Sequence, residues 1–74
     1  MNNLKNTYSI ILPTFNEVGH IKKLILEIYE IFLSSNDLFE IIIVDDNSTD
    51  GTSEIINKIS EANNAIISVI RKNK

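Results

Sequence analysis

Three short apolar runs, separated by two segments with a helical pattern, limit what this chain can fold into. The runs cover residues 8–12, 39–44 and 65–70 and are rich in β-branched side chains. Each run is nearly continuous rather than alternating, which is typical of strands covered on both faces of a parallel sheet. We therefore expect strands near residues 7–12, 39–45 and 65–71.

The two segments between these runs have the spacing of amphipathic helices. The first segment carries its charges off an apolar stripe that consists of Ile21, Leu24, Ile25, Ile28 and Phe32. The second segment has a shorter stripe made of Ile55, Ile56, Ile59 and Ala62. We expect helices near residues 17–35 and 51–63, the first capped by Asn16 and the second capped by Asp50 through an amide of its first turn.

The element order is therefore β-α-β-α-β, which predicts an α/β fold with a Rossmann-like parallel sheet. Each crossover is long enough to return the next strand parallel and with a right-handed connection. We expect the first strand to lie centrally, with the second and third stepping outward on one side. Because the chain stops directly after a strand, we expect residues 1–74 to be the incomplete N-terminal portion of a domain.

Composition excludes several classes of protein. The chain has no cysteine, so it holds neither a disulfide framework nor a thiolate metal site. Its net charge is −3, and residues 37–54 carry six acids and no base, which argues against a nucleic-acid surface. The longest apolar run is Ile41–Val44, far below the ~20 residues of a membrane span. The first residues lack the apolar core of a signal peptide, and we expect a cytoplasmic location.

The least ordinary residues follow the predicted strands. Residues 13–17 follow the first strand, the acidic stretch 45–52 follows the second, and Arg71 follows the third. Ligands of open parallel sheets bind beyond the carboxyl ends of the strands, and these residues all fall there. The pattern predicts a binding edge made of a proline, an aromatic ring, a glutamate and several aspartates.

The chemistry of this edge favours a nucleoside over a bare phosphate. No glycine-rich phosphate loop is present, and the adjacent Asp45 and Asp46 would repel a phosphate unless a cation lay between them. Carboxylates accept hydrogen bonds from the N–H groups of guanine or uracil and from ribose hydroxyls, at roughly 1.5–3 kcal/mol each. Phe15 offers a flat wall for a base, and Pro13 shapes the turn that carries it.

Two linked segments resemble a known family. Residues 9–17 read SIILPTFNE, and residues 40–52 read EIIIVDDNSTDGT. Together they resemble the start of family 2 glycosyltransferases of the GT-A fold, and within them most the dolichyl- or polyprenyl-phosphate mannose synthase branch. The resemblance runs from Tyr8 to Arg71.

The resemblance implies a set of nucleotide-binding residues, which are Pro13, Phe15, Glu17, Val44 and Asp46. It implies a structural role for Asp45 and Asp50, which would orient the loop and cap the second helix. Phe15 stands where a tyrosine is commoner in the family, so the ring is kept and the hydroxyl is lost.

The resemblance also implies an activity, namely inverting transfer of mannose from GDP-mannose to a polyprenyl (dolichyl) phosphate. The complete enzyme would use a divalent metal, Mg²⁺ or Mn²⁺, held by an Asp-x-Asp motif, and would meet the membrane surface peripherally. That motif and the acceptor site are not in this sequence, so we assign no catalytic residue and no metal ligand. We expect the chain alone to be inactive and to self-associate.

Other functions stay open at this point. The donor could be a UDP-sugar, or the chain could be a non-catalytic nucleotide-binding or assembly fragment. A phosphate-signalling receiver domain shares the acidic pair, but there the pair follows the first strand, whereas Asp45 and Asp46 follow the second. A receiver also needs an aspartate after the third strand, and none follows Ile70.

Simpler interpretations also stand beside the functional ones. The acidic pair could be a solvated turn, and residues 47–52 are good turn and cap chemistry in their own right. We interpret His20 as a surface residue and Tyr29 and Phe32 as packing residues. Arg71 could pair with a diphosphate, but we favour a solvated charge in a frayed tail.

Overall fold

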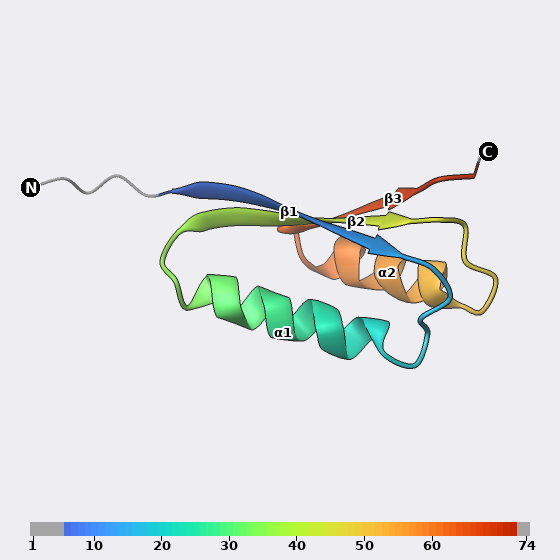
Figure 1. Cartoon of the computed structure of the whole chain (residues 1–74). Helices are drawn as coiled ribbons and strands as arrows, with labels where there is room; N and C mark the ends of the chain where they lie inside the picture. The colour runs from blue at the N-terminus through green and yellow to red at the C-terminus, as the bar shows by residue number, and fades with distance from the viewer. Residues whose placement is uncertain (1–5, 73–74) are drawn as a thin grey trace, which may run out of the picture.

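The computed structural model describes residues 6–72 as an α/β unit of three strands and two helices (Figure 1). In chain order the elements are β1 (Thr7–Thr14), α1 (Ile21–Leu33), β2 (Leu38–Asp45), α2 (Thr52–Ala62) and β3 (Ile66–Ile70). The predicted element order is confirmed, and every predicted boundary lies within a few residues of the observed one. The largest difference is at the start of α1.

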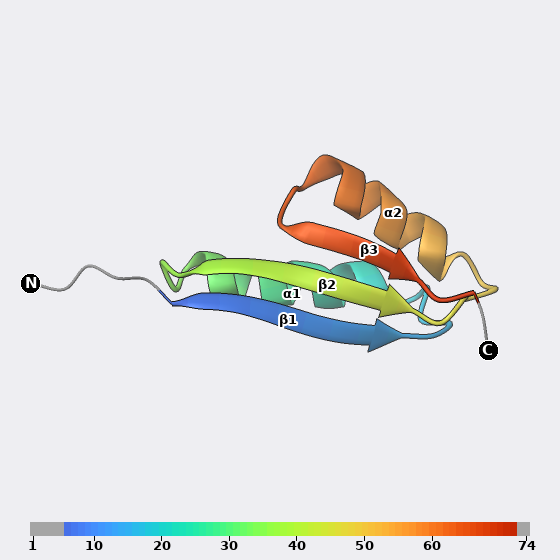
Figure 2. The ribbon, with the colours of Figure 1, turned by 90° about the horizontal axis from the view of Figure 1, so that it is seen from above.

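The sheet is parallel throughout, as predicted, and its order is β1-β2-β3 (Figure 2). Its register aligns Ile10 with Ile41 and Ile41 with Ile66. The second and third strands step outward on one side of β1, which confirms that part of the prediction. Among the strands of residues 6–72, β2 is the middle one, and the central place of β1, which was expected as in one half of a Rossmann-like sheet, stays a prediction.

Both helices lie on the same face of the sheet (Figure 1). The two crossovers step in the same direction, and crossovers of one hand that do so place their helices on one face. We call the opposite surface the helix-free face. There Ile11 is 58% exposed and Val69 is 41% exposed. The expectation of strands covered on both faces is therefore wrong for the described residues, and one face stays open for a site.

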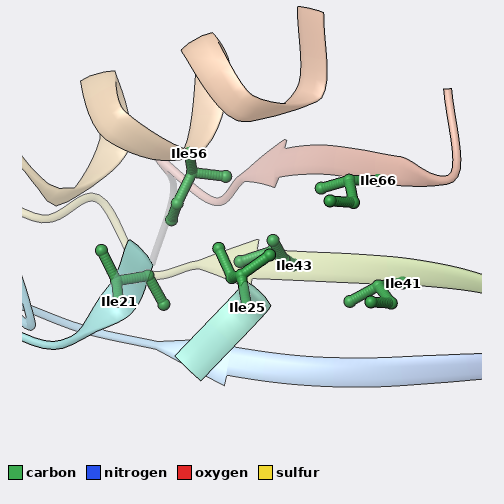
Figure 3. Packing of buried hydrophobic residues seen from close by; sticks show 6 residues of the cluster. All are labelled: Ile21, Ile25, Ile41, Ile43, Ile56 and Ile66. Atoms are coloured by element: carbon green, nitrogen blue, oxygen red, sulfur yellow. The ribbon is translucent and has the colours of Figure 1, made fainter. Parts of the chain in front are cut away.

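The core between the sheet and the helices consists of isoleucine side chains (Figure 3). They are Ile21 and Ile25 from α1, Ile41 and Ile43 from β2, Ile56 from α2 and Ile66 from β3. Burying one such side chain stabilises a fold by roughly 1.5–3 kcal/mol. Every element except β1 supplies a buried member of this cluster. The cluster therefore fixes both helices against the central strand.

An aromatic cluster closes the amino-terminal end of the sheet. The ring of Phe39 lies 5.6 Å from that of Tyr29 and 5.6 Å from that of Phe32, and Tyr8 lies 5.7 Å from Phe32. Such tilted pairs add about 0.5–1.5 kcal/mol each beyond simple burial. The predicted packing roles of Tyr29 and Phe32 are confirmed.

Both helix starts differ from the sequence prediction. Asn16 does not cap α1, because α1 begins only at Ile21, after a turn in which the amides of His20 and Ile21 both donate to the Glu17 carbonyl oxygen at 2.9 Å. The N-cap residue of α2 is Gly51 rather than Asp50, but the predicted bond is present, since the Asp50 carboxylate accepts the amide of Thr52 at 3.0 Å. Asn16 is used for a contact between loops, described below.

Candidate functional site

Two loops meet at the carboxyl edge of the sheet. We call residues 15–20 the β1–α1 loop and residues 46–51 the β2–α2 loop. They are neighbours because the register pairs Thr14 with Asp45, the last residues of β1 and β2. The backbone continues the pairing one step further, as the Asp46 amide donates to the Thr14 carbonyl oxygen at 3.0 Å.

Three consecutive backbone amides of the β1–α1 loop donate to side chains of the β2–α2 loop and of the first residue of α2. The amide of Asn16 donates to Ser48 Oγ at 2.8 Å, that of Glu17 to Thr52 Oγ1 at 2.9 Å, and that of Val18 to Asp50 Oδ2 at 3.1 Å. These bonds hold the backbone beside Phe15 and Glu17 in one place. The two sequence motifs are thus joined physically.

Asn16 completes this contact in the other direction. Its Oδ1 accepts the amide of Thr49 at 2.8 Å, which requires the loop to turn sharply. Its φ is 49°, in the left-handed region, and asparagine tolerates that region better than most residues. Asn47 has a φ of 58° for the return turn. Asparagine at both positions therefore suits the backbone that the contact needs.

Asp45 is fully buried and joins the end of β1, the β2–α2 loop and α2. Its Oδ1 accepts the hydroxyl of Thr14 at 2.7 Å and that of Ser48 at 2.6 Å. Its Oδ2 accepts the Ser48 amide at 2.8 Å and the Ser53 hydroxyl at 2.6 Å. Each oxygen receives two donors, which suits an ionised carboxylate in a buried place.

The pKa of Asp45 reflects the opposing effects of burial and hydrogen bonding. Burial by itself would raise the pKa, but the hydrogen bonds from the Ser48 and Ser53 hydroxyls, the Ser48 amide and the Thr14 hydroxyl outweigh burial and lower the pKa below its usual value. Asp45 therefore stays charged at neutral pH. Its role in the fold is to hold three elements together at the site.

Asp50 holds the start of α2 and the β1–α1 loop. It accepts the Thr52 hydroxyl, and that bond is the main cause that lowers its pKa, partly opposed by burial and supported by the amides of Val18 and Thr52. The hydroxyl of Thr52 in turn accepts the Glu17 amide, so Asp50, Thr52 and Glu17 form a chain of bonds. This links α2 to the residue predicted to bind a nucleotide.

One cleft at this edge has a volume of about 410 Å³ and lies on the helix-free face. Its lining consists of Pro13, Thr14, Phe15, Glu17, Val44, Asp46 and Arg71. All five residues predicted to bind a nucleotide are in this set. Pocket volumes of about 300–1,000 Å³ are usual for small ligands. The structure therefore brings the five residues together, and their binding role stays a prediction.

A family model described as Glycosyl transferase family 2 matches residues 9–74 of the chain. The chain belongs to the family 2 glycosyltransferases. The match confirms the family that the two motifs indicated, and with it the enzyme class. Members of this family transfer a sugar from a sugar nucleotide to an acceptor. No solved structure matches the chain.

The two adjacent aspartates of this glycosyltransferase chain lie on opposite faces of the sheet. Asp45 is 0% exposed and lies on the side covered by the helices, whereas Asp46 is exposed and lines the cleft. Adjacent residues of a strand point to opposite faces, which explains the division. Asp46 is therefore free to meet a ligand, and Asp45 has all its acceptor positions in use.

The family commonly uses a divalent metal, but the described residues do not fit one. Residues 6–72 contain no group of three or more His, Cys, Asp or Glu side chains placed to hold an ion. Of the acids at this edge, Asp45 is enclosed by hydroxyl and amide donors, which leaves Glu17 and Asp46 in the cleft. We therefore assign no step of the reaction to a metal held by these residues.

Arg71 lies at the binding edge, where the sequence pattern placed it, but the favoured interpretation of a frayed tail is wrong for its backbone. Its backbone is not frayed, because its amide donates to the Asp45 carbonyl oxygen at 2.7 Å and extends the β2–β3 ladder by one step. Its side chain is exposed but lines the cleft. The signal that could have found it is register, since Asp45 pairs with Ile70 and the next residues, Asp46 and Arg71, share a face.

His20, which the sequence analysis also considered, is not among the residues that line the cleft. His20 is exposed at the start of α1, in agreement with its interpretation as a surface residue. Among residues 6–72, no helix has the length and apolar character needed to cross a membrane.

Proposed function

We propose that this chain is the nucleotide-recognition part of a longer transferase domain, in which Pro13, Phe15, Glu17, Val44 and Asp46 bind the base and ribose of the donor. One observation carries the proposal, namely that these five residues line a single cleft at the carboxyl edge of a parallel sheet. Ligands of open parallel sheets bind at that edge.

Each residue supports a different part of the nucleoside. Phe15 is 55% exposed and offers its ring as an apolar surface on which a base can stack. The exposed carboxylate of Asp46 accepts the N–H groups of the base. Glu17 is half-buried, lines the cleft and has its backbone held by Thr52, which supports a role for its carboxylate as an acceptor for the ribose hydroxyls.

Pro13 and Val44 form the floor of the cleft. They are paired in the register of β1 and β2 and lie on the helix-free face. Pro13 has no N–H, which makes this part of the floor apolar and fixes the direction in which the β1–α1 loop leaves the sheet. The base is therefore received by an apolar floor with acids at its rim.

The finer assignment rests on the motif resemblance to polyprenyl-phosphate mannose synthases. It makes GDP-mannose the donor and a polyprenyl (dolichyl) phosphate the acceptor, with a cytoplasmic enzyme that meets the membrane peripherally. A Mg²⁺ or Mn²⁺ ion bound outside this chain would stabilise the departing diphosphate in the complete enzyme. Base and ribose contacts alone are uniform between ground and transition states, so we expect the 74-residue chain to form no glycolipid.

Calorimetric titration with GDP-mannose tests the proposal, on this chain and on the longer transferase. Asp46→Ala removes a charged acceptor and should weaken binding by about 1.5–3 kcal/mol. His20→Ala is the control and should change binding little, because His20 lies outside the cleft. Equal effects of the two substitutions would remove the basis of the site assignment. Tighter binding of UDP-sugars would overturn the GDP-mannose assignment alone.

A further inference from the structure

The outer side of α1 carries a stripe of five exposed residues. One side of α1 lies against the sheet, and no other element of residues 6–72 covers its outer side (Figure 1). The exposed residues Gly19, Lys22, Leu26, Glu30 and Leu33 follow one another at spacings of three or four, so they lie on one side of the helix. Leu26 is 43% exposed and Leu33 is 58% exposed. We call these five residues the α1 stripe.

The two charges of the α1 stripe have no partner within their own helix. On a helix surface, residues three or four positions apart are neighbours. Lys22 has no acid at these distances, and Glu30 has no base. Both charges also oppose the helix dipole, since Lys22 lies in the first turn, which has no acid, and Glu30 lies in the last turn, which has no base. The helix by itself therefore gains nothing from Lys22 and Glu30.

The spacing of the α1 stripe is symmetric about Leu26. Lys22 and Glu30 lie four residues to either side of Leu26, and Gly19 and Leu33 lie seven residues to either side. When two copies of such a stripe meet antiparallel with Leu26 at the centre, each lysine faces a glutamate. Each Leu33 then faces a glycine. The stripe is therefore complementary to a second copy of itself.

Gly19 leaves room for a side chain of that second copy. The turn before α1 is already wound like the helix, because the Ile21 amide donates to the Glu17 carbonyl oxygen, four residues back, at 2.9 Å. A Cβ added at Gly19 would meet nothing within 4 Å. An open cavity of about 440 Å³ covers this part of α1, and all the residues that line it lie within residues 18–30. The opposing Leu33 can therefore pack over Gly19.

We propose that α1 pairs antiparallel with α1 of a second copy of this chain, around a two-fold axis at Leu26. Lys22 of each copy faces Glu30 of the other, and the two Leu26 side chains meet at the axis. Both charges then gain the partner that their own helix lacks, and the two helix dipoles run in opposite directions. The inference does not depend on the proposed function, because no residue of the α1 stripe lines the nucleotide cleft.

The contact is short, so we expect a weak dimer. From Gly19 to Leu33 the stripe is about 21 Å long, at about 1.5 Å per residue. A helix pair of this length buries less surface than the roughly 1,200 Å² of a stable complex. The helix-free face lies on the other side of the sheet, so a contact there is separate and leaves the two copies of Leu26 apart (Figure 1). A measurement of the α1 pair must therefore report on Leu26 itself.

Cysteine cross-linking reports on the proposed axis, because the chain has no cysteine of its own. Leu26→Cys places one thiol at the axis in each copy, and a disulfide forms only where the two Cα atoms come within about 7 Å. Ile31→Cys is the matched control, since Ile31 is 65% exposed on the same helix but lies off the stripe. With diamide as the oxidant, Leu26→Cys should form disulfide-linked dimers about tenfold faster than Ile31→Cys, as measured on non-reducing gels.

Charge exchange tests the antiparallel arrangement. In the Leu26→Cys chain, Lys22→Glu or Glu30→Lys brings like charges face to face and should slow cross-linking by about tenfold. An equal mixture of these two variants restores opposite charges in every mixed dimer, so it should recover about half of the original rate. Each substitution agrees with the helix dipole, so a slower rate cannot come from a weaker helix.

Two substitutions on α2 are the controls for charge. Lys58→Glu and Glu61→Lys make the same changes of charge at exposed positions of α2. In the Leu26→Cys chain they should change the rate of cross-linking by less than about twofold, alone or mixed. Far-UV circular dichroism shows that each variant is folded.

Two results would overturn the inference. Equal rates for Leu26→Cys and Ile31→Cys would assign the disulfide to random collision. A mixture of the Lys22→Glu and Glu30→Lys chains that stays as slow as either chain alone would exclude the antiparallel pairing. Nucleotide binding by these two variants, measured by calorimetry, should equal that of the unaltered chain, because the α1 stripe lies outside the cleft. The helix pairing and the proposed function can therefore fail separately.

Discussion

At the residue scale, two adjacent aspartates have separate tasks. Asp45 accepts four hydrogen bonds under the helices, and Asp46 opens into the cleft on the other side of the sheet. The same substitution at the two positions should therefore affect different properties. Asp45 should matter for stability, and Asp46 should matter for ligand binding.

Asp45→Asn should destabilise the fold by about 1.5–3 kcal/mol, because the new amide group faces hydroxyl donors and the charge that they bonded is gone. Asp46→Asn makes the same chemical change at an exposed position and should alter stability by no more than about 0.5 kcal/mol. Urea unfolding followed by circular dichroism measures both. A larger loss of stability in Asp46→Asn than in Asp45→Asn would contradict the network around Asp45.

The same residue sets an expected dependence of stability on pH. The folded state lowers the pKa of Asp45, so its contribution is present above the unfolded-state pKa, about 4, and is lost as the pH falls through the lower folded value. Asp50 shifts in the same direction. As the pH is lowered below about 4, the urea concentration at the midpoint of unfolding should therefore decrease. The decrease should be less steep for Asp45→Asn. Parallel pH profiles for the two proteins would show that Asp45 is not the group responsible.

At the element scale, the β1–α1 and β2–α2 loops behave as one unit. Side chains that follow β2 accept hydrogen bonds from the amides of residues 16–18. One of them is Thr52, the first residue of α2, whose hydroxyl also donates to Asp50. The chain direction just before α2 depends on Gly51, whose φ is 100°. L-residues with a side chain rarely adopt that conformation.

Gly51→Ala should cost about 1–3 kcal/mol of stability, because an alanine is strained at this φ even though its Cβ would meet Val18 Cγ2 at an ordinary 3.6 Å. Gly19→Ala is the matched control, since an added Cβ there meets nothing within 4 Å and no positive φ is required. Thermal and urea unfolding compare the two variants. Equal stability of both would show that the turn before α2 relaxes without cost.

At the scale of the whole molecule, one face of the sheet is covered by helices and the other is not. The helix-free face exposes apolar residues from the two outer strands, namely Ile11, Ile67 and Val69. Parallel sheets are normally covered on both faces, and an open apolar face favours association. We expect the 74-residue chain to associate with itself through this face.

Sedimentation velocity over a range of concentrations should show this association. The double substitution Ile11→Thr with Val69→Thr keeps both β-branches and removes apolar surface, so it should shift the chain toward monomer. Ile31→Thr is the control, because Ile31 is 65% exposed but lies on α1, away from the helix-free face. Equal shifts in the two proteins, or a monomer at every concentration, would contradict association through this face.

Local pattern was enough to predict the elements and the edge that carries the cleft. Hydrophobic spacing defines strands and helices over a few neighbouring residues, and parallel strands joined by helices must bring their carboxyl ends to one edge. That rule and the family resemblance predict the candidate binding residues before any contact is known. These residues are Pro13, Phe15, Glu17, Val44 and Asp46. The parallel pairing of the three strands follows from the same spacing.

Tertiary structure decided the features that depend on residues far apart in the chain. The bonds from residues 16–18 to Ser48, Asp50 and Thr52 span 32 to 35 positions, and no local pattern specifies them. Coverage of one face, the middle position of β2 and the entry of Arg71 into the cleft depend on strand order and register. A one-residue shift in the register of β2 would turn Asp46 away from the cleft, and the same shift in β3 would turn Arg71 away, because successive side chains of a strand alternate between faces.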